Sequence, residues 1–146
     1  FLGLFGGIGQ EEGNDDYPFT LKTPVGEIQG ERGNAGFLKR YLYVHAGGNY
    51  DQQSGSTVAA QIVRSKRGVP GSISFPTPLA RQDDENVVLT ADYRDGHLHG
   101  IEFVLRTAFA YGLQRYRDPD PKFPIEMYYK NTSLALNPEF HVVVIP

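Results

Sequence analysis

The sequence predicts an all-β fold, and the composition is the main reason. Nine Tyr and nine Phe accompany many Val, Ile and Thr residues, which favour strands, while 17 Gly and 10 Pro supply residues for turns. Apolar residues make up 40% of the chain, which is typical of a globular protein. We therefore predict an antiparallel β-sandwich or small β-barrel of about eight to ten short strands, with little helix.

The first 16 residues differ in character from the rest of the chain. Phe1–Gly9 is apolar and glycine-rich, and Glu11–Asp16 is acidic and rich in turn formers. We interpret residues 1–16 as an N-terminal arm, whose apolar part is a strand or arm packed on the core or on a neighbouring subunit, because an exposed apolar arm is a liability in a free monomer. The alternative is a membrane-active segment, since viral fusion peptides resemble this mixture of bulky apolar residues and glycines. Residues 17–146 are then a single β domain.

Alternating apolar and polar residues predict the strands of the first half. A first strand is expected from Tyr17 to Thr23, and Phe37–Ala46 has the strongest pattern of all. Thr57–Arg64 is assigned to a strand because of its β-branched residues, and a short strand is expected at Ser72–Phe75. Arg64–Arg67 is interpreted as a basic loop that fits the R-x-[KR]-R pattern cut by furin-like convertases.

A hairpin is predicted in the second half. Asn86–Arg94 and His97–Arg106 both alternate, and Asp95-Gly96 between them is typical of a two-residue type I′ turn. Three short strands are expected to close the fold, at Ile125–Tyr129, Ser133–Leu136 and Phe140–Ile145.

The predicted hairpin would bring Asp92, Arg94, His97 and His99 to one face. Asp92, His97 and His99 could ligate a divalent metal or form an acid–base pair, and a metal-dependent enzyme is one hypothesis. The alternative is a solvated hairpin tip without function. Because no nucleophile elbow, P-loop or dinucleotide-binding fingerprint is present, the sequence does not indicate an enzyme and identifies no cofactor.

Tyrosines supply the candidate ligand-binding residues. Tyr41, Tyr43 and Tyr93 carry rings with a polar tip, which suit stacking on a carbohydrate or a small apolar ligand. The same rings also fill β cores. The net charge of −3 disfavours nucleic acid as the main partner, and no apolar run is long enough to predict a transmembrane segment.

Two features predict an extracellular, secreted protein. The chain begins with Phe rather than Met, and Asn131-Thr132-Ser133 is an acceptor for N-glycosylation at Asn131. The chain has no cysteine, so an exported domain must be stabilised by packing or by self-association instead of disulfides. We therefore expect a secreted, glycosylated binding domain within an oligomer; the alternative is a structural or storage subunit of an extracellular assembly.

Overall fold

The computed structural model describes residues 2–71, 77–98 and 101–142, which form eight strands and no helix. The predicted all-β class is confirmed. The strands are β1 (Leu2–Gly13), β2 (Tyr17–Thr23), β3 (Gly26–Arg32), β4 (Phe37–Asn49), β5 (Ser54–Gly68), β6 (Arg81–Leu98), β7 (Ile101–Asp118) and β8 (Ile125–Val142). Within this part of the chain, no helix has the length and apolar character needed to cross a membrane.

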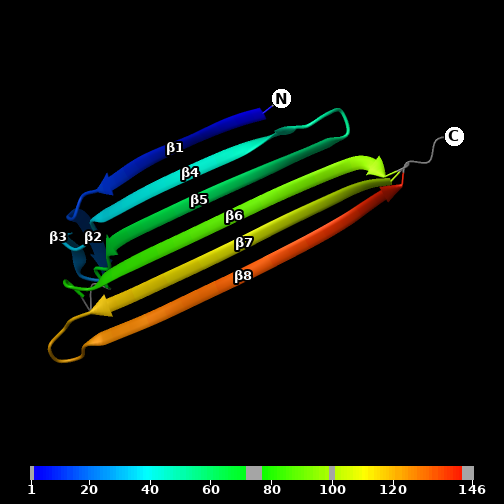
Figure 1. Ribbon diagram of the computed structural model, residues 1–146. Helices are drawn as coiled ribbons and strands as arrows, with labels where there is room; N and C mark the ends of the chain where they lie inside the picture. Colours follow the sequence, from blue (N-terminus) through cyan, green and yellow to red (C-terminus); the bar gives the residue numbers. More distant parts are fainter. Residues whose placement is uncertain (1, 72–76, 99–100, 143–146) are drawn as a thin grey trace.

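The strands form two antiparallel sheets, which is consistent with a β-sandwich. Six strands pair in the order β1-β4-β5-β6-β7-β8, and β2 pairs with β3 in a separate hairpin. Figure 1 shows the six strands side by side in one layer, with β2 and β3 at one end. Every neighbouring pair in the large sheet is antiparallel, so strand direction alternates from β1 to β8.

The strands are longer than the sequence pattern indicated. β6, β7 and β8 each contain 18 residues, and the prediction of three short closing strands was wrong. β8 pairs with β7 without interruption from Ile125 to Val142. The polar residues within β8 therefore take part in this antiparallel pairing instead of forming turns. The basic segment Arg64–Arg67 is likewise not a loop, because it lies within β5 and pairs with both β4 and β6.

The Asp95-Gly96 turn was also predicted wrongly. β6 continues to Leu98, which pairs with Ile101, and the register shifts between Asp95 and Leu98. The Asp95 carboxylate accepts a hydrogen bond from the backbone N–H of His97 at 2.9 Å, and the Gly96 N–H donates to the carbonyl of Gln53 at 3.0 Å. These contacts make the pair an irregularity within the strand. The predicted strand at Ser72–Phe75 lies outside the described residues.

The described residues enclose very little core. Only Ala80 and Val104 are buried hydrophobic residues among them. The chain exposes 10877 Å², whereas a folded monomer of 16.2 kDa typically exposes about 7,500 Å². The difference is on the order of 3,400 Å². A surface of this size is normally covered by a partner or by lipid.

Candidate functional site

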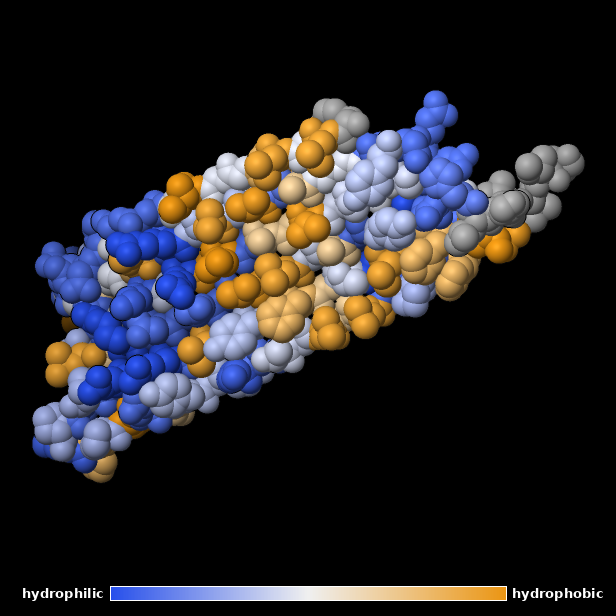
Figure 2. Space-filling view, in the orientation of Figure 1, coloured by the Kyte–Doolittle hydropathy of each residue, from blue (hydrophilic) through white to orange (hydrophobic). Residues whose placement is uncertain are grey.

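The six-stranded sheet has one continuous apolar face. Register partners in an antiparallel pair project to the same side, so they form rows across the sheet. Three successive rows contain almost only apolar side chains, and we call them the apolar band (Figure 2). The band consists of Leu4, Gly6, Ile8, Leu42, Val44, Ala46, Val58, Ala60, Ile62, Val87, Leu89, Ala91, Thr107, Phe109, Tyr111, Thr132, Leu134 and Leu136.

Nothing in the described chain covers this band. Leu4 is 74% exposed, Leu134 is 69% exposed, and even Leu89 near the centre is 42% exposed. Figure 2 shows the apolar side chains gathered in the middle of the strands, with hydrophilic side chains at the end that carries β2 and β3. A continuous exposed apolar surface of this kind normally marks contact with a partner or with lipid.

The apolar band ends abruptly in charged rows, which we call the charged rim. The rim begins with the row that follows Ile8, Leu42 and Ile62 in the register. Its acidic and basic members are Glu12, Arg40, Arg64, Lys66, Arg81, Asp83, Glu85, Arg115, Arg117, Glu126 and Lys130. Cations outnumber anions there, although the whole chain carries a net charge of −3. The sheet thus separates apolar and cationic surface along one face.

The opposite face, here the polar face, carries small and polar residues. On β1 this side carries four glycines besides Phe5 and Glu11, and aromatic rings from β4 lie over three of these glycines. A Cβ added to Gly9 would be 2.3 Å from the Tyr41 ring, and one added to Gly7 would be 2.8 Å from the Tyr43 ring. The rings of two predicted ligand-binding tyrosines therefore cover the backbone of β1, an arrangement that stabilises glycines at a sheet edge.

The three predicted ligand-binding tyrosines do not form one site. Tyr93 lies on the apolar face, opposite Leu105 and Ser56 in the register. Tyr41 and Tyr43 lie on the polar face. The alternation within a strand shows which residues share a face, but it does not show which face of the sheet that is. The sequence therefore could not reveal that these tyrosines lie on opposite faces.

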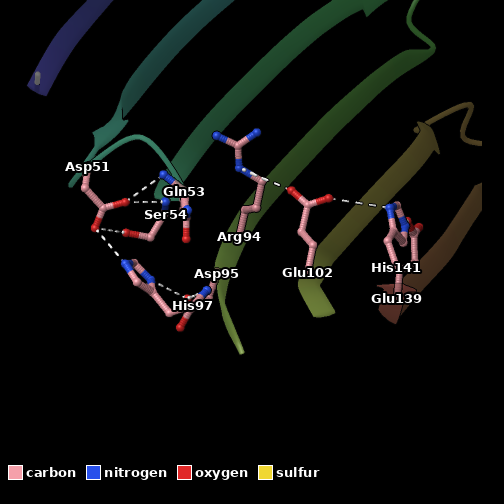
Figure 3. A network of polar contacts seen from close by, with 9 residues as sticks. All are labelled: Asp51, Gln53, Ser54, Arg94, Asp95, His97, Glu102, Glu139 and His141. Atoms are coloured by element: carbon pink, nitrogen blue, oxygen red, sulfur yellow. Dashed lines mark hydrogen bonds and ion pairs between the residues drawn. The ribbon is translucent and has the colours of Figure 1, made fainter. Parts of the chain in front are cut away.

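A polar network crosses β6, β7 and β8 on the polar face (Figure 3). Glu102 lies between Arg94, whose Nε is at 3.7 Å, and His141, whose Nδ1 is at 3.6 Å. The other nitrogen of His141, Nε2, is 3.2 Å from Glu139, which also accepts a hydrogen bond from Arg106. Each charge is thus balanced by a neighbour on the next strand.

A second polar group joins the β4–β5 connection to the end of β6. His97 Nδ1 is 2.8 Å from the Asp95 carboxylate, and its Nε2 is 3.4 Å from the Asp51 carboxylate (Figure 3). The hydrogen bond to Asp95, helped by the charge of Asp51, raises the pKa of His97 above its ordinary value. Backbone hydrogen bonds lower the pKa of both carboxyls, from Gln53 for Asp51 and from His97 for Asp95. We call this group the His97 clasp.

Two of the three predicted metal ligands, Asp92 and His97, lie within the described residues. Asp92 lies on the polar face, where it accepts a hydrogen bond from Thr57 at 3.2 Å, and His97 is held in the clasp. His99 lies outside the described residues. Across 2–71, 77–98 and 101–142, no group of three or more His, Asp or Glu side chains is arranged to hold a metal ion. Asn131, the predicted glycosylation site, is exposed on β8 opposite Gly112.

Sequence reasoning missed the polar network and the continuity of the apolar band. Glu102, Glu139 and His141 belong to strands whose register was unknown, so their proximity had no local signature. The alternation of apolar residues over Ile101–Leu113 was the one available signal of a single long apolar face. Comparisons with protein-family models, with curated proteins and with solved structures find no match to this chain.

Proposed function

We propose that this chain is a membrane-inserted subunit, with the apolar band against lipid acyl chains and the polar face toward water. The observation that carries this proposal is the apolar band itself, which crosses all six strands and ends in a charged rim. An alternating apolar and polar arrangement is what a strand needs when lipid lies on one side and water on the other.

The apolar stretch of β7 extends beyond the three rows of the apolar band, and this one strand is long enough to cross a bilayer. β7 presents only apolar residues and Thr107 on the apolar face from Ile101 to Leu113. At about 3.3 Å per residue this stretch is about 40 Å long, which is the length that a strand tilted by about 40° needs to cross a ~30 Å hydrocarbon core. The strands β4 to β8 contain 13 to 18 residues, more than the ~9–11 that a spanning strand requires.

The limits of the band favour lipid over a second copy of the same face. Tyr111 and Tyr128 lie toward the charged rim, and Tyr93 lies toward the other limit of the band. Tyrosine is enriched where a membrane meets water, because its ring is apolar and its hydroxyl is polar. Face-to-face packing of two copies would bury apolar residues equally well, but it gives no role to cations at one end.

Insertion also requires that the sheet edges be paired. In lipid every backbone N–H and C=O must be hydrogen-bonded, and among the described residues the outer edges of β1 and β8 have no strand partner. Because the sheet has an even number of alternating strands, β1 of one copy can continue β8 of another in the antiparallel sense. We therefore propose a closed ring of copies that encloses an aqueous lumen lined by the polar face.

Single cysteines test the proposal, since the chain has none of its own. Ala59 and Ala60 are neighbouring alanines on β5 that lie on the polar face and in the apolar band, respectively. Each is replaced by Cys, labelled with an environment-sensitive fluorophore and mixed with phosphatidylcholine vesicles. We expect the label at position 60 to be quenched by brominated lipid but not by iodide, and the label at position 59 to be quenched by iodide only.

Other outcomes would overturn the proposal in distinct ways. If iodide reaches both labels in vesicles, the domain remains in water, and the secreted ligand-binding domain expected from the sequence is preferred. That second candidate is supported by a groove that Tyr41 helps to line. If the label at position 60 is shielded without any vesicles, a second copy covers the band, and light scattering will report the assembly.

A further inference from the structure

We infer that Arg40 and Arg64 form a binding site for the phosphate group of an anionic lipid, an inference that rests on the proposed membrane insertion. The two arginines are direct register partners on β4 and β5. They occupy the first row of the charged rim, immediately after Leu42 and Ile62 of the apolar band. A lipid beside this pair would place its phosphate on the arginines and its acyl chains on the band.

A groove joins the charged and apolar parts of this site. It is lined by Ile8, Gly9, Gln10, Arg40, Tyr41, Leu42, Ile62 and Arg64. Apolar side chains therefore lie on the side of the groove toward the band, and guanidinium groups lie on the side toward the rim. This juxtaposition matches an amphiphile with an anionic head and does not match a small inorganic anion, which needs no apolar surface.

The charges at the site are incompletely balanced. Arg64 donates to Glu85 at 3.1 Å, whereas Arg40 donates through Nε to the neutral amide oxygen of Gln10 at 2.8 Å. Among the described residues, no carboxylate lies within ion-pair distance of Arg40. Like charges that are directly opposite on neighbouring strands destabilise a sheet. A phosphate between the two guanidinium groups would replace this repulsion with charge-assisted hydrogen bonds.

The wider rim supports an anionic ligand. Register places Lys66, Arg115 and Lys130 on the same face and at the same end of the sheet. Basic residues beside an apolar segment are attracted to anionic head groups at a membrane surface. Arginine is also suited to phosphate because its planar guanidinium group can donate two parallel hydrogen bonds.

The test compares vesicles of phosphatidylcholine alone with vesicles in which part of it is replaced by phosphatidylglycerol. Binding of the full chain is followed with the fluorophore at position 60. We expect the unaltered rim to favour the anionic vesicles, and the double variant Arg40→Gln/Arg64→Gln to reduce that preference roughly thirtyfold. The matched control is Lys39→Gln/Arg67→Gln, which removes two charges from the same strands and the same end but from the polar face.

The outcomes separate this inference from the function on which it rests. If the label is not shielded in either vesicle, the membrane proposal fails. If the label is shielded but the control loses as much preference as the double variant, the attraction is unspecific and the site is overturned. If millimolar inorganic phosphate abolishes the preference of the unaltered protein, the ligand is a free anion and the lipid assignment is overturned.

Discussion

The two faces of the large sheet are built from the same strands but differ in the side chains that they carry. Leu89 and Val88 are neighbours on β6, and in the isolated chain their exposures are similar, at 42% and 38%. Leu89 lies in the apolar band between Ala60 and Phe109, whereas Val88 lies on the polar face between Gln61 and Ala110. Exposure alone therefore does not distinguish the faces. The residues that surround each side chain do distinguish the faces. This difference affects stability only where the two faces meet different environments, as lipid and water do at a bilayer.

The largest expected effect comes from one charge placed on either face. We expect Leu89→Arg to destabilise the inserted sheet by about 2–4 kcal/mol, because an arginine near the bilayer midplane loses its hydration. Val88→Arg, which would face the lumen, is expected to have a much smaller effect. Urea titration of both variants in vesicles measures the free energy of unfolding. Equal effects of the two substitutions would contradict the assignment of the faces.

A smaller effect is expected from the glycines that let aromatic rings lie on β1. Gly9→Val would force the Tyr41 ring away from the strand, and we expect a cost of about 1–3 kcal/mol. The cost should largely disappear in a Tyr41→Ala background, because the two side chains would no longer compete for space. Hydrogen exchange of the β1 amides measures the loosening of this edge. An undiminished cost in the double variant would show that the ring is not the cause.

The smallest effect concerns the His97 clasp, which lies at one end of the sheet. The raised pKa of His97 means that its contribution is full below its ordinary value of 6.5 and is lost as the pH rises through the raised pKa. The lowered pKa values of Asp51 and Asp95 mean that their contributions are full above 3.8 and are lost as the pH falls through the lowered values. The clasp is thus strongest between these two ordinary values.

Exchange of the Gly96 amide, which donates to the Gln53 carbonyl, reports on this clasp. We expect faster opening at about pH 8 than at about pH 5, after correction for intrinsic exchange. His97→Gln should remove this dependence, because glutamine does not titrate. A pH dependence that persists in this variant would assign the effect to another group. The effect will be modest, since the His97 side chain is 55% exposed.

Local signals predicted strands well and turns less well. Phe37–Ala46 alternates strongly and lies within β4. The neighbouring strands β1 and β5 pair with it in registers that keep its apolar residues on one face of the sheet. Asp95-Gly96 has the signature of a turn, but the Gln53 carbonyl accepts the Gly96 N–H and keeps the segment within β6. That acceptor lies on a distant connection, so no local pattern could include it.

The glycine-rich start of the chain shows the same limit. Glycines are depleted in strands because they have no side chain to pack, so the sequence left a strand and an arm as alternatives for the apolar start of the chain. In the structure, rings from β4 fill the space above these glycines, so Leu2–Gly13 forms a strand. The compensating residues lie roughly thirty positions away in the register, for example Tyr41 beside Gly9.

The sequence by itself determined that the chain is all-β and that its strands alternate between apolar and polar residues, because both properties follow from residue type and a period of two. Only the tertiary structure decided which strands are neighbours and in which register they pair. That register aligns the apolar residues of six strands into one uncovered band and brings Arg40 opposite Arg64 at its border. Register depends on contacts between distant segments, and a shift of one residue would exchange the two faces of a strand.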